Sequence, residues 1–163
     1  MELILIRHGK AEERGDPSLD AKRALTPEGR KKLLKSMPGL RSFIEKTDRM
    51  LIWSSRLDRA AQTADVLAGI FGTPVIDYHE FISEGVFTDM LEALAAVKPS
   101  DTVLVVGHEP YLGLWSQQLC GLTLPFKKGA AAGFSISGLN PPEAELIWFA
   151  QPQTLTRMNR DSR

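Results

Sequence analysis

Short apolar runs alternate with longer amphipathic segments along the chain. The runs at residues 3–6, 50–53 and 102–106 are almost entirely apolar and rich in β-branched side chains. Runs of this kind predict strands that are buried on both faces, as in a parallel sheet. Weaker strand patterns follow later in the chain. The predicted strands cover residues 3–6, 50–53, 75–78, 102–106, 133–137 and 145–149.

Helical periodicity fills most of the segments between these strands. Thr26, Pro27 and Glu28 form a helix start, with a hydroxyl at the N-cap and proline at the first helical position. That helix is expected to run toward residues 43–44, with a break at Pro38 and Gly39. Three more helices are predicted, after the serines at 54–55 and over residues 87–97 and 111–119.

The remaining segments are expected to be irregular. Residues 10–25 and 79–85 are predicted to be loops, and the polar tail from about residue 151 is predicted to be poorly ordered at its end. Strands that alternate with helices indicate a three-layer α/β/α sandwich with a mostly parallel central sheet. The length of 163 residues fits a single domain over residues 1–163.

Composition narrows the class of protein. Lysine plus arginine equals aspartate plus glutamate, 20 against 20, so a general attraction to nucleic acid or anionic membrane is not expected. Cys120 is the single cysteine, so no intrachain disulfide can form. No apolar run approaches the roughly 20 residues that span a bilayer, and the N-terminal residues do not resemble a signal peptide. We therefore expect a cytoplasmic protein.

Three predicted strands end in unusual polar groups: Arg7-His8-Gly9, Ser54-Ser55-Arg56 and Gly107-His108-Glu109. Ligands of open α/β sheets bind beyond the carboxyl ends of the strands. If those ends are neighbours, two imidazoles and two guanidiniums share one pocket, a set that suits a phosphoryl dianion. Gly9 would let the backbone approach the bound group closely.

A histidine between two arginines has a second consequence. Neighbouring positive charge disfavours the imidazolium form, so the ring stays neutral and nucleophilic near pH 7. A neutral imidazole can attack phosphorus and hold the phosphoryl group covalently, while arginines stabilise the charge on its oxygens. Two cations in the same pocket would repel a metal ion, so no metal is expected. The Gly-rich loop of a nucleotide-binding P-loop is also missing, and no other cofactor is expected.

Three motifs in order resemble the histidine phosphatase superfamily, the phosphoglycerate mutase-like group. They are Leu-Ile-Arg-His-Gly at residues 5–9, Ser-Ser-Arg-Leu-Asp-Arg-Ala-Ala-Gln-Thr-Ala at 54–64 and Val-Val-Gly-His-Glu-Pro at 105–110. Within the superfamily, the short chain resembles the SixA type of phosphohistidine phosphatase. The resemblance implies that His8 is the nucleophile and that Arg7, Arg56 and a cationic His108 bind the phosphoryl group. Arg59 is expected to have a structural role, paired with Asp58 or Asp65.

The proton donor is less specified by these motifs. Larger members carry a glutamate between the second and third motifs, and Glu80 occupies about that place, with Glu84 as the competitor. Residues 10–12, Lys-Ala-Glu, depart from the Glu-Thr or Glu-Ser that mutases carry there, which weakens a mutase assignment. The span between the second and third motifs is too short for a large lid, and an open site favours a phosphate carried on a protein surface.

These observations lead to one main expectation and two alternatives. We expect a phosphatase that removes phosphate from phosphohistidine on a protein partner through a phosphohistidine intermediate. The first alternative is a small-molecule phosphomonoesterase, for which Glu80 would be needed because an alkoxide leaving group requires a proton. The second is a non-catalytic phosphate-binding module on the same fold.

Overall fold

The central feature of the computed structural model, which describes residues 1–45 and 48–161, is one mixed sheet. The strand order is β3-β2-β4-β1-β5-β6. Strands β1 to β4 are parallel, whereas β5 runs antiparallel to both β1 and β6. The strands are β1 (Glu2–Arg7), β2 (Met50–Ser54), β3 (Ile76–Tyr78), β4 (Thr102–Gly107), β5 (Ala131–Leu139) and β6 (Pro142–Ala150).

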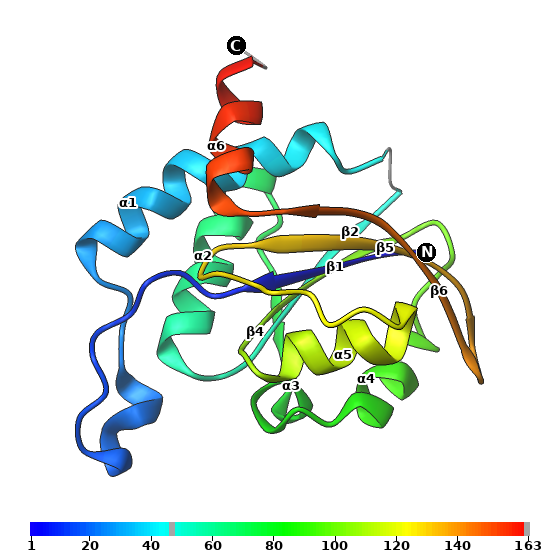
Figure 1. Cartoon of the computed structure of the whole chain (residues 1–163), viewed down its shortest axis with the longest axis horizontal. Helices are drawn as coiled ribbons and strands as arrows, with labels where there is room; N and C mark the ends of the chain where they lie inside the picture. Colours follow the sequence, from blue (N-terminus) through cyan, green and yellow to red (C-terminus); the bar gives the residue numbers. More distant parts are fainter. Residues whose placement is uncertain (46–47, 162–163) are drawn as a thin grey trace.

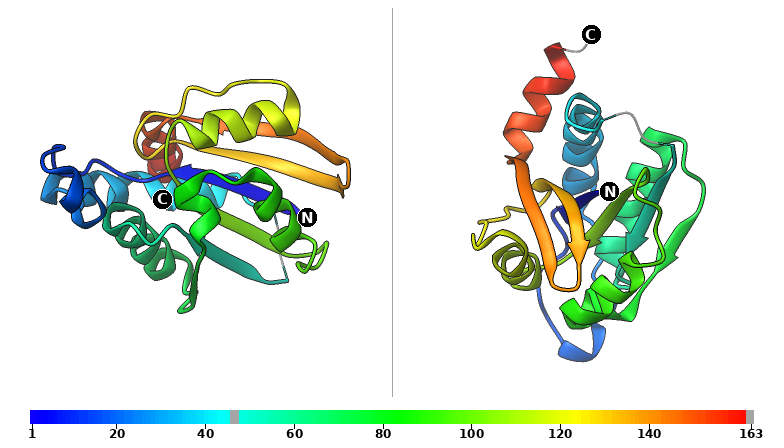
Figure 2. Two further views of the ribbon diagram at one scale, coloured as in Figure 1. Left: turned by 90° about the horizontal axis from the view of Figure 1, so that it is seen from below. Right: turned by 90° about the vertical axis from the view of Figure 1, so that its right-hand side faces the viewer.

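Helices cover both faces of this sheet, and Figures 1 and 2 show the layers from three directions. One face is packed against α1 (Pro27–Ser36), η2 (Met37–Ser42), α2 (Asp58–Phe71) and α6 (Pro152–Asp161). The other face is packed against α3 (Glu80–Glu84), α4 (Phe87–Leu94) and α5 (Tyr111–Cys120). The predicted three-layer α/β/α architecture with a mostly parallel sheet is thus confirmed.

The apolar run of β1 explains why that strand lies in the interior. Leu3 and Leu5 point into the core beneath α3 to α5, while Ile4 and Ile6 point into the core beneath α1 and α2. All four side chains are fully buried. A strand that alternates between two cores needs apolar residues at every position.

The expected helix start and break are both present. The Thr26 hydroxyl accepts a hydrogen bond from the Gly29 amide at 2.9 Å, and Pro27 is the first residue of α1. The helix gives way to the 3₁₀ helix η2 at Met37, immediately before Pro38. A third short helix, η1 (Pro17–Lys22), interrupts the predicted loop between β1 and α1.

Two further segments differ from the prediction. Residues 80–84 form helix α3 rather than a loop, because Ile82 is fully buried against the sheet. The expected polar tail contains α6, which is anchored by the fully buried Leu155 and packs closely on Gly39 of η2. Its end, residues 162–163, lies outside the described residues. Of the helices in the described ranges, none has the length and apolar character needed to cross a bilayer.

The register of the parallel strands determines what meets at their carboxyl ends. Arg7 pairs with Gly107, and Ser54 pairs with Val106. The pairing continues one residue further, since the His8 amide donates to the Gly107 carbonyl at 3.1 Å. The first and third motifs are therefore adjacent, with the second motif on the other side of β4.

Candidate active site

Two buried histidines face each other at the carboxyl ends of β1 and β4. The ring centroids of His8 and His108 lie 5.1 Å apart, with 54° between the ring planes. Only 6% of His8 and 5% of His108 is exposed. The predicted convergence of these two side chains is therefore present in the structure.

A backbone contact determines which nitrogen of His8 carries the proton. Its Nδ1 lies 2.7 Å from the Gly9 carbonyl oxygen. A carbonyl oxygen only accepts, so Nδ1 must be the protonated nitrogen. In the neutral ring the lone pair is then on Nε2, the nitrogen available for attack on phosphorus.

Both rings are held in the neutral form. The pKa of His8 is lowered to about 4, mainly by burial and also by the positive charges of Arg59, Arg7 and Lys128, against the opposing hydrogen bond to Gly9. Burial also lowers the pKa of His108 to about 3, helped by His8 and the nearby arginines. The expected neutral His8 agrees with these directions, although burial rather than neighbouring charge is the main cause. The expected cationic His108 concerns the pocket with a phosphoryl group bound and stays a prediction; without that group, burial favours the neutral ring.

The histidines line a pocket of about 380 Å³ whose walls are strongly cationic. Four buried nitrogens there have no hydrogen-bond partner among the described residues: Arg7 Nε, Arg59 Nε, and both ring nitrogens of His108. Guanidinium Nε–H groups that are buried without acceptors favour an anionic ligand with several oxygens. The pocket is lined by Arg7, His8, Lys10, Ala11, Glu12, Glu13, Arg14, Arg23, Arg59, His108, Glu109 and Lys128.

The second arginine of the pocket is Arg59, not the predicted Arg56. Arg59 is 6% exposed and lines the pocket. The Arg56 side chain is 64% exposed, does not line the pocket, and lies 3.6 Å from a Glu80 carboxylate oxygen. The reason is geometric: Arg56 precedes α2, whereas Arg59 lies in its first turn, on the side that faces β1.

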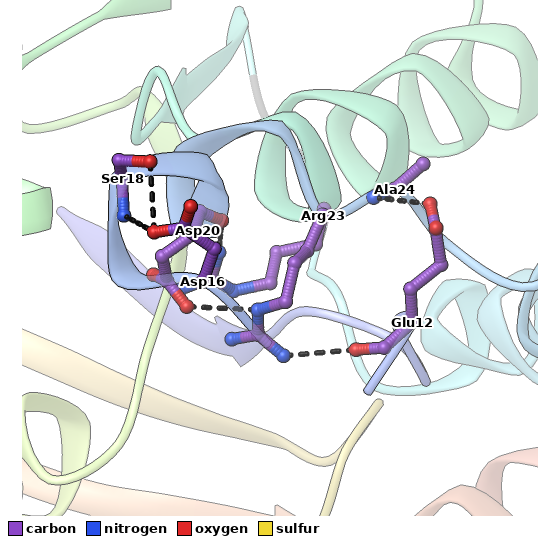
Figure 3. A network of polar contacts seen from close by, with 7 residues as sticks. Glu12, Asp16, Ser18, Asp20, Arg23 and Ala24 are labelled. Carbon is purple, nitrogen blue, oxygen red and sulfur yellow. Dashed lines mark hydrogen bonds and ion pairs between the residues drawn. The ribbon is translucent and has the colours of Figure 1, made fainter. Parts of the chain in front are cut away.

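The long connection after β1 holds Arg59 in place. Arg59 Nη1 donates to the Asp20 carbonyl oxygen at 3.0 Å, and Nη2 lies 3.3 Å from the Asp20 carboxylate. That carboxylate also accepts a 2.8 Å bond from Arg23, whose guanidinium donates to the Glu12 carbonyl oxygen (Figure 3). The partner predicted for Arg59, Asp58 or Asp65, is therefore replaced by Asp20 of η1.

Gly9 and Thr63 join the end of β1 to α2. The Gly9 amide donates to the Thr63 hydroxyl at 3.1 Å, and that hydroxyl donates to the Arg59 carbonyl oxygen at 2.8 Å. The Gly9 amide is thus bound to Thr63, and the role of Gly9 in phosphate binding stays a prediction. A Cβ at Gly9 would lie 2.6 Å from Leu33 Cδ1, so the glycine permits close packing against α1.

The structure separates the predicted proton donors from the pocket. Glu80 is 74% exposed, beside Arg56, and Glu84 is also exposed; neither lines the pocket. Glu109 does line it, and burial raises the pKa of its carboxyl group against the opposing effects of Arg7 and the Gly113 amide. Among the described residues, no group of three or more His, Cys, Asp or Glu side chains could hold a metal ion.

A periodic signal in the sequence could have identified Arg59. Arg59 and Thr63 are four residues apart and share a helix stripe with buried Ala60, Val66 and Leu67. An arginine on the buried stripe of an amphipathic helix requires a polar or anionic partner. The strand-end rule drew attention instead to Arg56, the first arginine after β2.

Comparisons with known proteins agree with this geometry. The sequence model of the histidine phosphatase superfamily (branch 1) matches residues 3–84. An uncharacterized protein of Picosynechococcus sp. is 32% identical over 141 residues, which cover 82% of this chain and 84% of that protein.

Solved structures share the fold over nearly the whole chain. The protein histidine phosphatase SixA complexed with tungstate has a TM-score of 0.76 at 22% identity and covers 95% of this chain and 99% of its own. A protein from Nakamurella multipartitia, proposed to be a SixA phosphohistidine phosphatase, has a TM-score of 0.74 at 26% identity, with coverage of 93% and 95%. A mycobacterial glucosyl-3-phosphoglycerate phosphatase has a TM-score of 0.69 at 18% identity, with coverage of 93% and 98%. The sequence match, together with the paired histidines at the ends of β1 and β4, makes this chain a phosphatase of the histidine phosphatase superfamily, branch 1.

Proposed function

We propose that the chain hydrolyses phosphohistidine on a protein partner, with His8 as the nucleophile and a phosphohistidine intermediate. The observation that carries the proposal is the 2.7 Å contact between His8 Nδ1 and the Gly9 carbonyl oxygen. It leaves the Nε2 lone pair as the attacking group of a buried, neutral ring. The cationic nitrogens around it would bind the phosphoryl oxygens.

The first step exchanges one N–P bond for another. Nε2 of His8 attacks phosphorus in line, and the substrate's P–N bond breaks with its electron pair moving to the departing imidazole. The His8 ring then carries a positive charge, which its Nδ1–H bond to the Gly9 carbonyl stabilises. Arg7 and Arg59 would offset the charge on the transferring oxygens.

In the second step water attacks phosphorus and the N–P bond to His8 breaks. Its electron pair returns to Nε2, which restores the neutral ring. The protons of the water leave with the product as dihydrogen phosphate or pass to solvent. Neither step needs a metal ion, because the charge on the phosphoryl group is balanced by arginine side chains.

The leaving group favours phosphohistidine over a phosphate ester. A phosphohistidine ring that is protonated on its other nitrogen departs as neutral imidazole, whereas an alkoxide requires a proton donor. Glu80, the donor expected from the sequence, is exposed beside Arg56 rather than in the pocket. The fold shared with SixA proteins supports the same substrate class.

Phosphate labelling tests the proposal. The protein would be mixed with a ³²P-phosphohistidine peptide for milliseconds, quenched in base and examined for radiolabel. We expect acid-labile, base-stable label on the wild type and none on His8→Ala. His79→Ala, which alters a histidine outside the pocket, serves as the control. Retained turnover in His8→Ala, or phosphate binding by the wild type without turnover, would contradict the proposal.

A specific observation favours a second candidate, a small-molecule phosphomonoesterase. The Glu109 carboxyl lines the pocket directly after His108, and burial favours its protonated form. A protonated carboxyl at that place could donate to an alkoxide leaving group. Glu109→Gln should then lower kcat for a phosphate monoester by about 10²-fold or more and spare phosphohistidine. An equal, small effect on both substrates would remove this candidate.

A further inference from the structure

A second hollow opens beside the phosphoryl pocket. It has a volume of about 450 Å³ and lies between α1 and the segment that connects α5 to β5. The two hollows share Arg7, Lys10 and Lys128, so they lie next to each other. We call this second hollow the lysine groove; its lining is Arg7, Gly9, Lys10, Gly29, Lys32, Leu33, Ser36, Lys127, Lys128, Gly129 and Pro152.

The charge of the lysine groove has one sign. Every charged side chain in its lining is a lysine or arginine. Glu28, outside the lining, is paired with Lys10 at 2.9 Å and with Lys32 at 3.1 Å, so one carboxylate serves two ammonium groups. Lys127 and Lys128 form no ion pair with any described residue. The groove therefore keeps an excess of positive charge on a chain whose net charge is zero.

The lining of the phosphoryl pocket outside the shared residues carries both signs of charge. Glu12 and Glu13 line the pocket together with Arg14 and Arg23. The two carboxylates and two guanidiniums there offset one another, whereas the lysine groove is lined by positive side chains alone, so an acidic ligand is attracted most strongly over the groove. The charge distribution thus gives the substrate one preferred side of approach.

The groove is attached firmly to the nucleophile. The Gly129 amide donates to the carbonyl oxygens of both Arg7 and His8 at 3.1 Å. The Lys127 amide lies 3.3 Å from the side-chain oxygen of Gln151, whose amide nitrogen donates to the Pro125 carbonyl at 2.9 Å. The backbone that carries Lys127 and Lys128 is therefore joined directly to the strand end that carries His8.

The size and the lining of the groove favour a polypeptide as its ligand. Together the two hollows are larger than a phosphoryl group requires, and the groove includes the apolar side chains of Leu33 and Pro152. Resting on the proposed phosphohistidine activity, we propose that the lysine groove binds an acidic segment of the protein substrate, next to its phosphorylated histidine. The lysines would bind carboxylates of that segment, while Pro152 would contact its apolar atoms.

Charge reversal at the groove tests this proposal without touching the phosphoryl pocket. Lys32→Glu/Lys127→Glu changes two lysines that line only the groove. Lys31→Glu/Lys98→Glu makes the same change in charge at two exposed lysines outside both hollows. Three substrates would be compared: an acidic phosphohistidine peptide, its twin with Asn and Gln in place of Asp and Glu, and free phosphohistidine.

We expect the wild type to prefer the acidic peptide over its neutral twin in kcat/KM by about tenfold, and the preference to shrink with added salt. The groove variant should lose that preference and keep its activity on free phosphohistidine, while the control variant should behave as the wild type. Equal kcat/KM for both peptides in the wild type would overturn the groove and leave the proposed function intact.

Binding without turnover separates the two proposals. An unphosphorylated, fluorescein-labelled acidic peptide would be titrated with each variant, with a DNA oligonucleotide of equal charge as competitor. If the wild type hydrolyses no phosphohistidine, the proposed function fails. Even then, if only the groove variant binds the peptide more weakly than the wild type, the proposed role of the lysine groove is supported. Equal peptide binding by all variants, or tighter binding of the oligonucleotide, would overturn it.

Discussion

The rings of His8 and His108 lie 5.1 Å apart because Arg7 of β1 is in register with Gly107 of β4. Each ring follows a strand that is buried in the middle of the sheet, so neither can move far without disturbing the core. This arrangement buries two titratable rings side by side. Because burial disfavours the protonated form of each ring, the stability of the fold depends on pH.

The first prediction concerns that dependence. Burial lowers the pKa of His8 to about 4 and that of His108 to about 3, below the value of about 6.5 in the unfolded chain. Between these values the unfolded state binds more protons, so stability is full above pH 6.5 and is lost as the pH falls toward 4 and then 3. At pH 5 each ring should cost about 2 kcal/mol of unfolding free energy.

Urea unfolding at pH 7.5 and pH 5 measures this cost. Between these two pH values, His8→Asn/His108→Asn should lose less stability than the wild type. The carboxylates contribute equally to both proteins, so the difference between the two losses reports on the two histidines. His79→Asn keeps both buried rings and should show most of the wild-type loss. An identical loss in the wild type and the double variant would mean that the two rings do not titrate as described.

The second prediction concerns the protonation of His108 when an oxyanion binds. Its ring nitrogens are buried without hydrogen-bond partners among the described residues, and its pKa is low. A phosphate dianion in the pocket would favour the imidazolium, and should raise the pKa by about 1 to 3 pH units. NMR titration of the histidine ring protons with and without inorganic phosphate measures this change. His79, outside the pocket, is the internal control, and saturation with phosphate without a change at His108 would contradict the prediction.

The third prediction separates the two arginines of the second motif. Arg59 lines the pocket, whereas Arg56 is exposed beside Glu80. Arg59→Lys keeps the charge but loses the planar fork, and should lower kcat by about 10²-fold or more. Arg56→Lys and Arg56→Ala should change kcat by no more than about threefold, as expected for a side chain in an exposed ion pair. The reverse order of effects would restore Arg56 as the phosphate ligand.

Much of the fold and half of the pocket could be predicted from the sequence. The β1 and β4 segments are apolar at consecutive positions because each strand faces two cores, and this pattern is independent of distant contacts. Since the carboxyl ends of parallel strands lie at one edge of the sheet, the proximity of Arg7, His8 and His108 followed from chain position alone.

The predictions were wrong where the structure depends on the direction of a side chain or on contacts between residues far apart in the sequence. Arg56 follows a strand end as predicted, but its guanidinium lies 5.9 Å from the Tyr78 ring centroid on the outer side. Arg59 lies on the buried stripe of α2, and its guanidinium is bound by Asp20, 39 residues earlier in the chain. The polar segment after residue 151 folds as α6 because Leu155 packs into the core beneath α1 and η2. The sequence near residue 155 alone does not show where that side chain would be buried.

The fourth prediction tests how closely α6 packs on η2. An ideal Cβ on Gly39 would lie 2.0 Å from the Leu155 carbonyl oxygen, and neither backbone can yield without moving α6. Gly39→Ala should therefore destabilise the fold by about 1–3 kcal/mol and increase amide hydrogen exchange in residues 152–161.

Gly69→Ala is the matched control, because nothing lies within 4 Å of its Cβ position in α2. Alanine is favoured over glycine inside a helix by about 0.8–1 kcal/mol, so this variant should be slightly more stable. If Gly39→Ala were also neutral or stabilising, with unchanged exchange in α6, the close contact between Gly39 and Leu155 would be disproved.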